Sequence, residues 1–346
     1  MSEIINLISD TSTHPTEEMR KAMYAAEVGD DVQKADPTVN ELQKLAAKVV
    51  GMEDSLFVPS GTMGNLIAIM CHCPAGKEIF LESECHIYRN EVGGVARVAG
   101  LMPNLIKGEY GIIDPDDLRA AIREENVHRP TPGIIAIENT HNIGGGTVYP
   151  VEYLKEYRRI ADEHGLIVHM DGARVFNAAV YLGVDVKEIV KYTDSVTFCL
   201  SKGLSAPVGA MLCGTADFIK KALWVRKMLG GGMRQAGVIA APGIISLNQM
   251  VDRLAEDHKN ARKLAEGLNE INGISVDLKA VQTNLVYFKF DADSNKNAVY
   301  FAGELKEKYG VLCEVNNPGL IRMVTHRQVS NENIDYVLDC ALKIMS

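Results

Sequence analysis

The run Ile167-Val168-His169-Met170-Asp171-Gly172-Ala173-Arg174 most directly indicates how this chain folds. Its first four residues are mostly apolar on successive positions, which is typical of a short strand covered on both faces. A carboxylate, Asp171, follows this strand directly. The carboxyl ends of parallel strands meet at one crevice, so polar side chains that follow such strands are candidates for function.

Further short apolar runs lie on either side of this one along the chain. They are residues 56–58, 79–81, 134–137, 196–200 and 210–213. Amphipathic helical patterns separate them, for example residues 151–163, which are followed by Gly165, a residue type common just past a helix end. Strands that alternate with helices predict an α/β fold with a mainly parallel, doubly wound sheet.

The pattern changes after about residue 244. A long polar helix at 244–272 is followed by strands at 285–290 and 320–324 and helices at 298–309 and 331–345. This order is typical of an α+β unit with antiparallel strands. We therefore predict an N-terminal segment, 1–40, that packs on both domains, a large α/β domain, 41–245, and a smaller α+β C-terminal domain, 246–346.

Composition narrows the classes of partner. The chain has 346 residues, 47% of them hydrophobic and 23% charged, which is a globular composition. Its net charge of −9 repels phosphate backbones, so we expect no nucleic-acid partner. No apolar run approaches the ~18–20 residues that span a bilayer, so we expect no membrane partner. The N-terminus shows no secretion signal, and the seven cysteines mostly sit beside apolar residues, so we expect reduced thiols and a cytoplasmic location.

Three polar groups follow predicted strands, and each also has a purely structural interpretation. Ser60, Gly61 and Thr62 open a helix, where free N–H groups and hydroxyls can bind a phosphate, although Ser60 is also an ordinary helix cap. Asp171 needs a cationic partner if it is buried, and Arg174 alone could supply it. Lys202 follows an apolar strand, where desolvation favours a nucleophilic neutral amine, although a lysine there is more often a solvated loop charge.

Taken together, the three groups match the needs of one cofactor. Pyridoxal phosphate (PLP) requires a lysine for its aldehyde, an acid for its ring nitrogen and an anion site for its phosphate. A metal centre competes poorly, because Cys71-His72-Cys73 matches no standard zinc spacing and Cys85-His86 is isolated. We therefore expect PLP as the cofactor and no metal.

Motifs along nearly the whole chain resemble the threonine aldolases, in the aromatic amino acid beta-eliminating lyase/threonine aldolase family of PLP enzymes. The motifs are Ser9-Asp10-Thr11, Gly29-Asp30-Asp31-Val32, residues 36–42, residues 60–65, His86-Ile87-Tyr88, Glu138-Asn139-Thr140-His141, residues 171–174, Leu200-Ser201-Lys202-Gly203, residues 230–237 and residues 322–326. The resemblance implies the aminotransferase-like fold type I, with a mainly parallel, seven-stranded central sheet. It also implies a homodimer or homotetramer with shared active sites.

The resemblance also implies roles for individual residues, here described in two groups. On the cofactor side it gives Lys202 as the covalent attachment point, Asp171 at the ring nitrogen and Ser60, Gly61 and Thr62 at the phosphate. Two further residues complete that side: His86, which would stack on the ring or sit beside the substrate hydroxyl, and Arg174, which would lie near O3′.

On the substrate side, Arg322 and Ser9, or alternatively Arg174, would take the carboxylate. Arg234 would reach a partner subunit's phosphate. The sequence departs from the family at Ile8 and at residues 31–37, near the expected substrate entrance.

The predicted reaction is cleavage of L-threonine, L-allo-threonine or both to glycine and acetaldehyde, with low stereospecificity at the β-carbon. His86 or His141 would accept the β-hydroxyl proton, because the pKa of imidazole lies nearest to working pH. A β-eliminating lyase or racemase acting on another amino acid is the alternative within the PLP enzymes. A catalytically silent PLP-binding protein is the alternative from another class.

Overall fold

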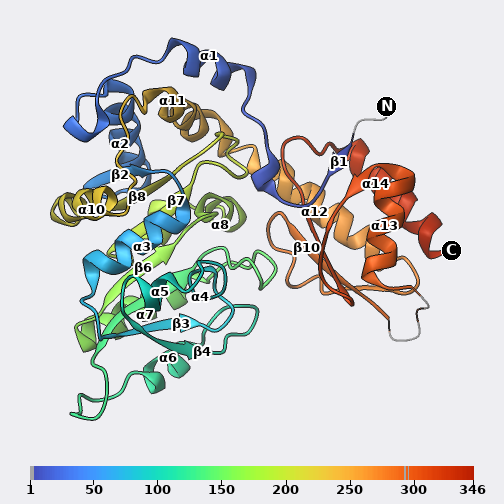
Figure 1. Ribbon diagram of the computed structural model, residues 1–346. Helices are drawn as coiled ribbons and strands as arrows, with labels where there is room; N and C mark the ends of the chain where they lie inside the picture. The colour runs from blue at the N-terminus through green and yellow to red at the C-terminus, as the bar shows by residue number, and fades with distance from the viewer. Residues whose placement is uncertain (1–3, 292–293, 295) are drawn as a thin grey trace.

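A computed structural model describes residues 4–291, 294 and 296–346 of the chain (Figure 1). Its largest element is a seven-stranded sheet in the order β2-β8-β7-β6-β5-β3-β4. The strands are β2 (Asp54–Val58), β3 (Glu78–Glu82), β4 (Met102–Ile106), β5 (Pro132–Glu138), β6 (Ile167–Asp171), β7 (Ser195–Cys199) and β8 (Ala210–Gly214). All neighbouring pairs are parallel except those made by β8, which runs antiparallel to β2 and β7. The predicted α/β class and mainly parallel sheet are confirmed.

Helices cover this sheet on both faces. They are α2 (Pro37–Val50), α3 (Gly61–His72), α4 (His86–Arg89), α5 (Gly94–Arg97), α6 (Pro115–Ala121), α7 (Val151–His164), α8 (Val175–Leu182), α9 (Lys187–Val190), α10 (Ala216–Met228) and α11 (Gly237–Ile245). The helix α7 follows its predicted pattern: Leu154, Tyr157 and Ile160 are buried, and Gly165 ends it with a φ of 65°. No helix in the described part of the chain is both long and apolar enough to cross a membrane.

The C-terminal region has its own sheet and its own apolar core. Its elements are α12 (Leu254–Asn269), β9 (Ile274–Val276), β10 (Leu285–Phe290), α13 (Ala298–Tyr309), β11 (Val311–Leu312), β12 (Glu314–Asn317), β13 (Leu320–Val324) and α14 (Asn331–Met345). The strands β12-β13-β10-β9 pair antiparallel, as we expected for this region. A separate apolar cluster, which includes Leu264, Phe288 and Phe301, fills the space between this sheet and its helices.

The single helix predicted at 244–272 is wrong. After α11 the chain makes a π-helical turn, Ser246–Met250, and α12 starts only at Leu254. The interruption lets the two helices take different partners: α11 packs on α1 and α2, whereas α12 packs on α14 and β10. Irregular turns of this kind are a common cause of a change in helix direction.

The N-terminal segment touches both regions (Figure 1). The strand β1 (Ile5–Asn6) pairs in parallel with β11, and Leu7 joins the C-terminal apolar cluster. After a 3₁₀ turn (Asp10–Ser12), α1 (Glu17–Ala25) packs on α11, and a second 3₁₀ turn (Asp31–Gln33) leads into α2. The division at 40/41 and 245/246 stays a prediction.

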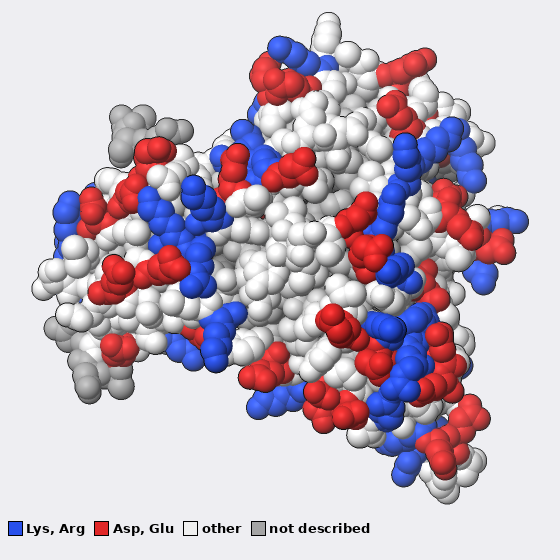
Figure 2. Space-filling view, turned by 180° about the vertical axis from the view of Figure 1, so that it is seen from behind, with Lys and Arg blue, Asp and Glu red and all other residues white. Residues whose placement is uncertain are grey.

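Charges on the surface are mixed in sign. Figure 2 shows Lys and Arg interspersed with Asp and Glu around an uncharged central area of one face.

Candidate active site

A cavity of about 240 Å³ lies where the carboxyl ends of β5, β6 and β7 approach β12 and β13 of the C-terminal region. Six residues that we predicted for the site line it: Ser9, His86, Asp171, Arg174, Lys202 and Arg322. Larger hollows exist elsewhere, including one of about 650 Å³ between α2 and α8, but their linings contain none of these residues. The chemistry of the side chains, rather than volume, therefore marks the smaller cavity as the candidate site.

Asp171 ends β6 and is only 2% exposed. Its Oδ2 accepts a hydrogen bond from Asn65 Nδ2 at 2.9 Å, and its Oδ1 accepts one from the Ala173 backbone N–H at 3.1 Å. Arg174 is bound elsewhere, so the structural interpretation of Asp171 and Arg174 as an isolated pair does not hold. The carboxylate faces the cavity with both oxygens held in place.

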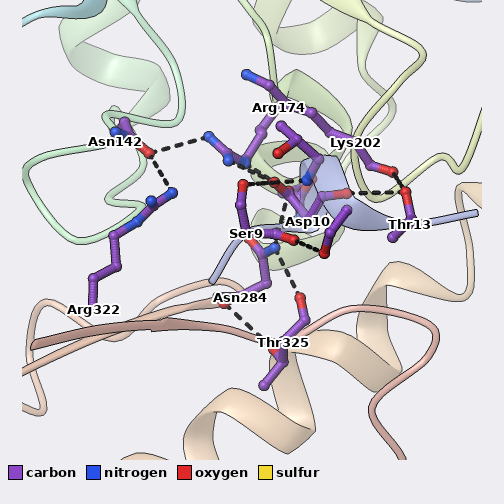
Figure 3. A network of polar contacts seen from close by, with 12 residues as sticks. Ser9, Asp10, Thr13, Asn142, Arg174, Lys202, Asn284, Arg322 and Thr325 are labelled. Carbon is purple, nitrogen blue, oxygen red and sulfur yellow. Dashed lines mark hydrogen bonds and ion pairs between the residues drawn. The ribbon is translucent and has the colours of Figure 1, made fainter. Parts of the chain in front are cut away.

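Lys202 follows β7 at the same edge of the sheet. Val58 at the end of β2 and Cys199 at the end of β7 both pair with Ala210 on the intervening strand, so these two carboxyl ends lie level. Thr13 Oγ1 donates to the Lys202 carbonyl at 2.8 Å, which ties this turn to the N-terminal segment (Figure 3). The half-buried lysine therefore shares the cavity with Asp171.

His86 begins α4 and lines the cavity. Its Nδ1 lies 3.0 Å from Glu91 Oε1, and its backbone N–H donates to Glu138 Oε2 at 2.6 Å. Burial of the ring lowers the pKa of His86, but the bond to Glu91 and the nearby carboxylate charges outweigh it, so the net pKa is raised. If Nδ1 carries the proton shared with Glu91, Nε2 remains for a substrate.

His141 is fully buried and does not line the cavity. Its Nε2 lies 3.0 Å from Glu82 Oε2 and 3.8 Å from Glu138 Oε2. Burial lowers the pKa of His141, but the two carboxylates outweigh it, so the net pKa of His141 is raised. In turn, the hydrogen bond to His141 helps to lower the pKa of Glu82 to about 2, although burial of Glu82 acts in the opposite direction. The structure therefore separates the two candidate histidines: one faces the cavity and the other lies behind its wall.

Arg174 is largely engaged by Asp10, a residue to which we assigned no role. Its Nε and Nη2 donate to the two carboxylate oxygens at 2.8 and 2.7 Å (Figure 3). Asp10 is completely buried, yet Arg174 holds the pKa of this carboxyl well below its usual range, despite the opposing effect of burial. Asn284 Nδ2 also donates to Asp10 at 3.2 Å. A substrate carboxylate would thus find the guanidinium of Arg174 already neutralised.

Arg322 approaches the cavity from β13. It forms an ion pair with Glu314 on the neighbouring strand β12, and its Nη2 donates to Asn142 Oδ1 at 3.2 Å. The same amide oxygen accepts from Arg174 Nη1 at 3.3 Å, so Asn142 bridges the two arginines (Figure 3). The side chain of Glu314 is 40% exposed, and a competing carboxylate can therefore replace it more easily than the buried Asp10.

The start of α3 lies outside the cavity lining, although α3 packs against β6 and β7. Ser60 caps the helix by accepting from the Met63 N–H at 3.2 Å, as the structural interpretation expected. The first N–H groups of a helix lack partners within it, and those of Gly61 and Thr62 are in this position. A Cβ on Gly61 would come within 2.9 Å of Cys199 Sγ, so glycine keeps this approach open.

Comparison with known proteins agrees with this arrangement. A family model described as beta-eliminating lyase matches residues 6–291. The chain belongs to the beta-eliminating lyase family. It is 45% identical over 345 residues to low-specificity L-threonine aldolase 1 of Arabidopsis thaliana, covering 99% of this chain and 96% of the relative. It is 43% identical over 332 residues to the low-specificity L-threonine aldolase of Escherichia coli K12, covering 96% of each chain.

The fold agrees as well. The structure of a threonine aldolase from Leishmania major superposes with a TM-score of 0.84 at 18% identity, covering 99% of this chain and all of the other. The predicted resemblance to threonine aldolases and the lyase class of this enzyme are therefore confirmed.

The donor set of this lyase fits PLP. An amine and a carboxylate share one cavity. The open start of α3 follows β2, whose carboxyl end lies level with that of β7, and Gly61 is its point of close approach to Cys199. Arg234 is not part of this set: its side chain is 59% exposed and pairs with Asp30 at 2.8 Å.

Sequence reasoning missed four residues that shape the cavity: Asp10, Glu91, Asn142 and Glu314. The first three each lie within five residues of a predicted site residue in the sequence, and that proximity is the signal that could have drawn attention to them. Glu314 offered no such signal, because only the pairing of β12 with β13 brings it to Arg322.

Proposed function

We propose that the enzyme uses PLP to cleave L-threonine, L-allo-threonine or both to glycine and acetaldehyde, with low stereospecificity at the β-carbon. The observation that carries this proposal is the single cavity in which Lys202, Asp171, His86 and Arg322 meet. These four supply an amine for the cofactor aldehyde, an acid for its ring nitrogen, a base and a carboxylate anchor. No other cavity described above collects these groups.

Lys202 would hold the cofactor covalently, and Asp171 would keep the ring nitrogen protonated. The start of α3, at Ser60, Gly61 and Thr62, would take the phosphate. When bound, PLP supplies an electron sink for the electron pair left at Cα when a bond to it breaks. Each of these assignments rests on position at the carboxyl edge of the sheet.

Arg322 would bind the substrate carboxylate, with Ser9 beside it. Two parallel hydrogen bonds from a guanidinium fix the orientation of a carboxylate, and this orientation decides which bond to Cα breaks. The resting partner of Arg322, Glu314, would have to leave first. We assign Arg174 to the support of this anchor through Asn142, because Asp10 already occupies two of its donors.

Nε2 of His86 would take the proton of the β-hydroxyl. Glu91 holds the opposite ring nitrogen and so orients the ring, as a partner carboxylate does in other His-based catalytic sites. His141 would act as a positioning residue, because it reaches the cavity wall only through Glu138, which it approaches from behind.

Product analysis with the purified enzyme tests this function. Incubation with each of the four threonine stereoisomers should release glycine and acetaldehyde from both L-isomers, with L-threonine and L-allo-threonine cleaved at comparable rates. Ammonia and a keto acid would instead indicate β-elimination, and interconverted stereoisomers a racemase. A cofactor spectrum without turnover of any β-hydroxy amino acid would indicate a silent PLP-binding protein.

Replacement of the attachment lysine tests the cofactor assignment. Borohydride reduction of the wild type should fix the pyridoxyl group to Lys202, and in Lys202→Ala it should fix none. Lys227→Ala is the matched control, since Lys227 is exposed on α10. A pyridoxyl group found on another lysine of the wild type would refute the assignment.

Arg234 and the cysteines bear on assembly and location. Arg234 would contact the phosphate of a partner subunit in a dimer or tetramer, since its exposed side chain is free to reach outward from its pair with Asp30. The seven cysteines form no disulfide within the described residues, which favours a reducing compartment such as the cytoplasm. Arg234→Ala should weaken PLP binding only in the assembled enzyme, which titration of the cofactor at several protein concentrations can show.

A further inference from the structure

A continuous line of buried and partly buried polar side chains leads away from Asp171 between α3 and the sheet. Asn65 on α3 lies between Asp171 and His169, with Nδ2 2.9 Å from the carboxylate and Oδ1 3.2 Å from His169 Nε2. His169 Nδ1 lies 2.9 Å from Ser195 Oγ, and the same oxygen lies 2.8 Å from His72 Nε2. Asn65, His169 and Ser195 are 0 or 1% exposed.

The local geometry explains why these residues meet. Side chains two positions apart on a strand point to the same face, so His169 and Asp171 on β6 face the same way. Ser195 on β7 is the direct neighbour of His169 across the sheet. The helix α3 packs on β6 and β7, carrying Asn65 near its start and His72 at its end.

The direction of the first bond is fixed by charge. The amide nitrogen of Asn65 lies 2.9 Å from a carboxylate oxygen of Asp171 and also 2.9 Å from one of Glu91. An amide oxygen in that place would face two acceptors, so the nitrogen must occupy it. The Asn65 oxygen, which has no hydrogen, therefore points at His169, and Nε2 of His169 must be the donor.

The remaining directions follow one after another. Burial lowers the pKa of His169 to about 3, so the ring is neutral and carries one hydrogen, on Nε2. Its Nδ1 must then accept, and the Ser195 hydroxyl must donate to it. Because that hydroxyl has a single hydrogen, His72 Nε2 must donate to Ser195, and burial likewise lowers the pKa of His72 to about 4.

We propose that His72, Ser195, His169 and Asn65 form a one-way hydrogen-bond chain, in which every donor points toward Asp171 and which positions that carboxylate. The chain's effect on the cofactor rests on the function proposed above, in which Asp171 binds the ring nitrogen. Successive bonds with the same direction polarise one another, so each strengthens the donor presented to the carboxylate. The four are positioning residues, and none lines the cavity.

The hydrogen positions can be tested on the cofactor-free protein. Nitrogen-15 NMR of histidine-labelled protein distinguishes a ring nitrogen that carries hydrogen from one that does not, and His→Gln variants assign the signals. Both His169 and His72 should be neutral with hydrogen on Nε2. In Ser195→Ala, His72 should lose this fixed tautomer while His169 keeps it, because Asn65 still requires a donor. Hydrogen on Nδ1 of His169, or a mixture of tautomers in the wild type, would overturn the proposal.

Two substitutions of one residue test the consequence for the cofactor. Gln at position 169 can still donate to Asn65 and accept from Ser195, whereas Leu can do neither. We expect His169→Leu to lower kcat on the order of 5- to 100-fold, as for one unsatisfied buried polar group, and His169→Gln to recover most of that loss. The nitrogen-15 signal of labelled PLP should move in the Leu variant and not in the Gln variant. Ser195→Ala, a smaller change, should shift the signal in the same direction as His169→Leu.

If His169→Leu and His169→Gln had the same effect on kcat and on the PLP nitrogen-15 signal, the positioning role would be refuted. Loss of packing alone would affect both variants alike, whereas loss of the hydrogen bonds would affect only the Leu variant. Failure of the proposed function would look different. The wild type would then bind no PLP and cleave no threonine, while the tautomers of His169 and His72 would still report whether the chain exists.

Discussion

Replacing Arg322 should separate substrate binding from cofactor chemistry. Arg322 is 8% exposed, so a carboxylate bound to its guanidinium is shielded from water. Loss of a charge-assisted pair in such a place costs about 2–4 kcal/mol. The substrate carboxylate must first displace the partly exposed Glu314 from Arg322, which reduces the free energy gained from the new pair by about 0.2–1 kcal/mol. At about 1.4 kcal/mol per factor of ten, the remaining loss of about 1–3.8 kcal/mol means that Arg322→Ala should lower kcat/KM for threonine on the order of 5- to 500-fold.

The assay is steady-state cleavage of threonine, combined with the visible spectrum of the resting enzyme. The spectrum should barely change, because the link between Lys202 and the cofactor needs no substrate carboxylate. Arg322→Lys should recover only part of the loss, since an ammonium cannot reproduce the two parallel bonds of a guanidinium.

An alanine variant with near-normal KM would refute this reasoning, and Arg174 would then be the better candidate for the carboxylate. Outright loss of PLP would also refute it, because Arg322 would then support the contact between the two regions.

Three further predictions concern other parts of the site. Asp171→Asn should keep the fold and lower kcat far more than PLP affinity, measured by turnover and by cofactor titration; an unchanged kcat would make the residue structural. Glu314→Gln should lower KM for threonine roughly 1.5- to 5-fold with kcat unchanged, since it frees the anchor from a partly exposed partner; a raised KM would contradict this. Asp10→Asn should lower the free energy of unfolding by about 3–5 kcal/mol near neutral pH, because it leaves Arg174 buried without its partner. The folded-state pKa of Asp10 is depressed, so the wild type's advantage is present above the ordinary carboxyl pKa of 3.8 and shrinks as pH falls below it, which urea unfolding at several pH values can follow.

The central sheet could be predicted because most of its strands have a recognisable local sequence pattern. Residues 167–170 and 196–200 are mostly apolar on successive positions, and this pattern depends on burial on both faces of the sheet. The edge strand β4 was missed because Met102 is exposed and Pro103 interrupts its pattern, as is common in strands at a sheet edge. The polar residues at the strand ends were visible for the same local reason, and the cavity brings together Asp171 and Lys202, although the start of α3 lies outside its lining.

Contacts between distant segments were not predictable from local pattern. Asp10 and Arg174 are 164 positions apart, and the sequence offers each of them several possible partners of opposite charge. Only the path of the N-terminal segment, held to the C-terminal region through β1 and β11, brings the carboxylate to the guanidinium. The prediction of Arg174 as a substrate ligand was therefore made without knowledge that Asp10 neutralises its guanidinium.

The two histidines show the same limit most clearly. Both follow strands and both are flanked by acidic residues, so composition gives them equal claims to the proton of the β-hydroxyl. Their difference lies in which wall of the cavity they belong to: His86 starts α4 with its side chain 32% exposed, whereas His141 is sealed behind Glu82 and Glu138. A raised pKa alone does not make a histidine a catalytic base, because the ring must also reach the substrate. Access therefore decides between them, and access is a property of the packed molecule that no short stretch of sequence contains.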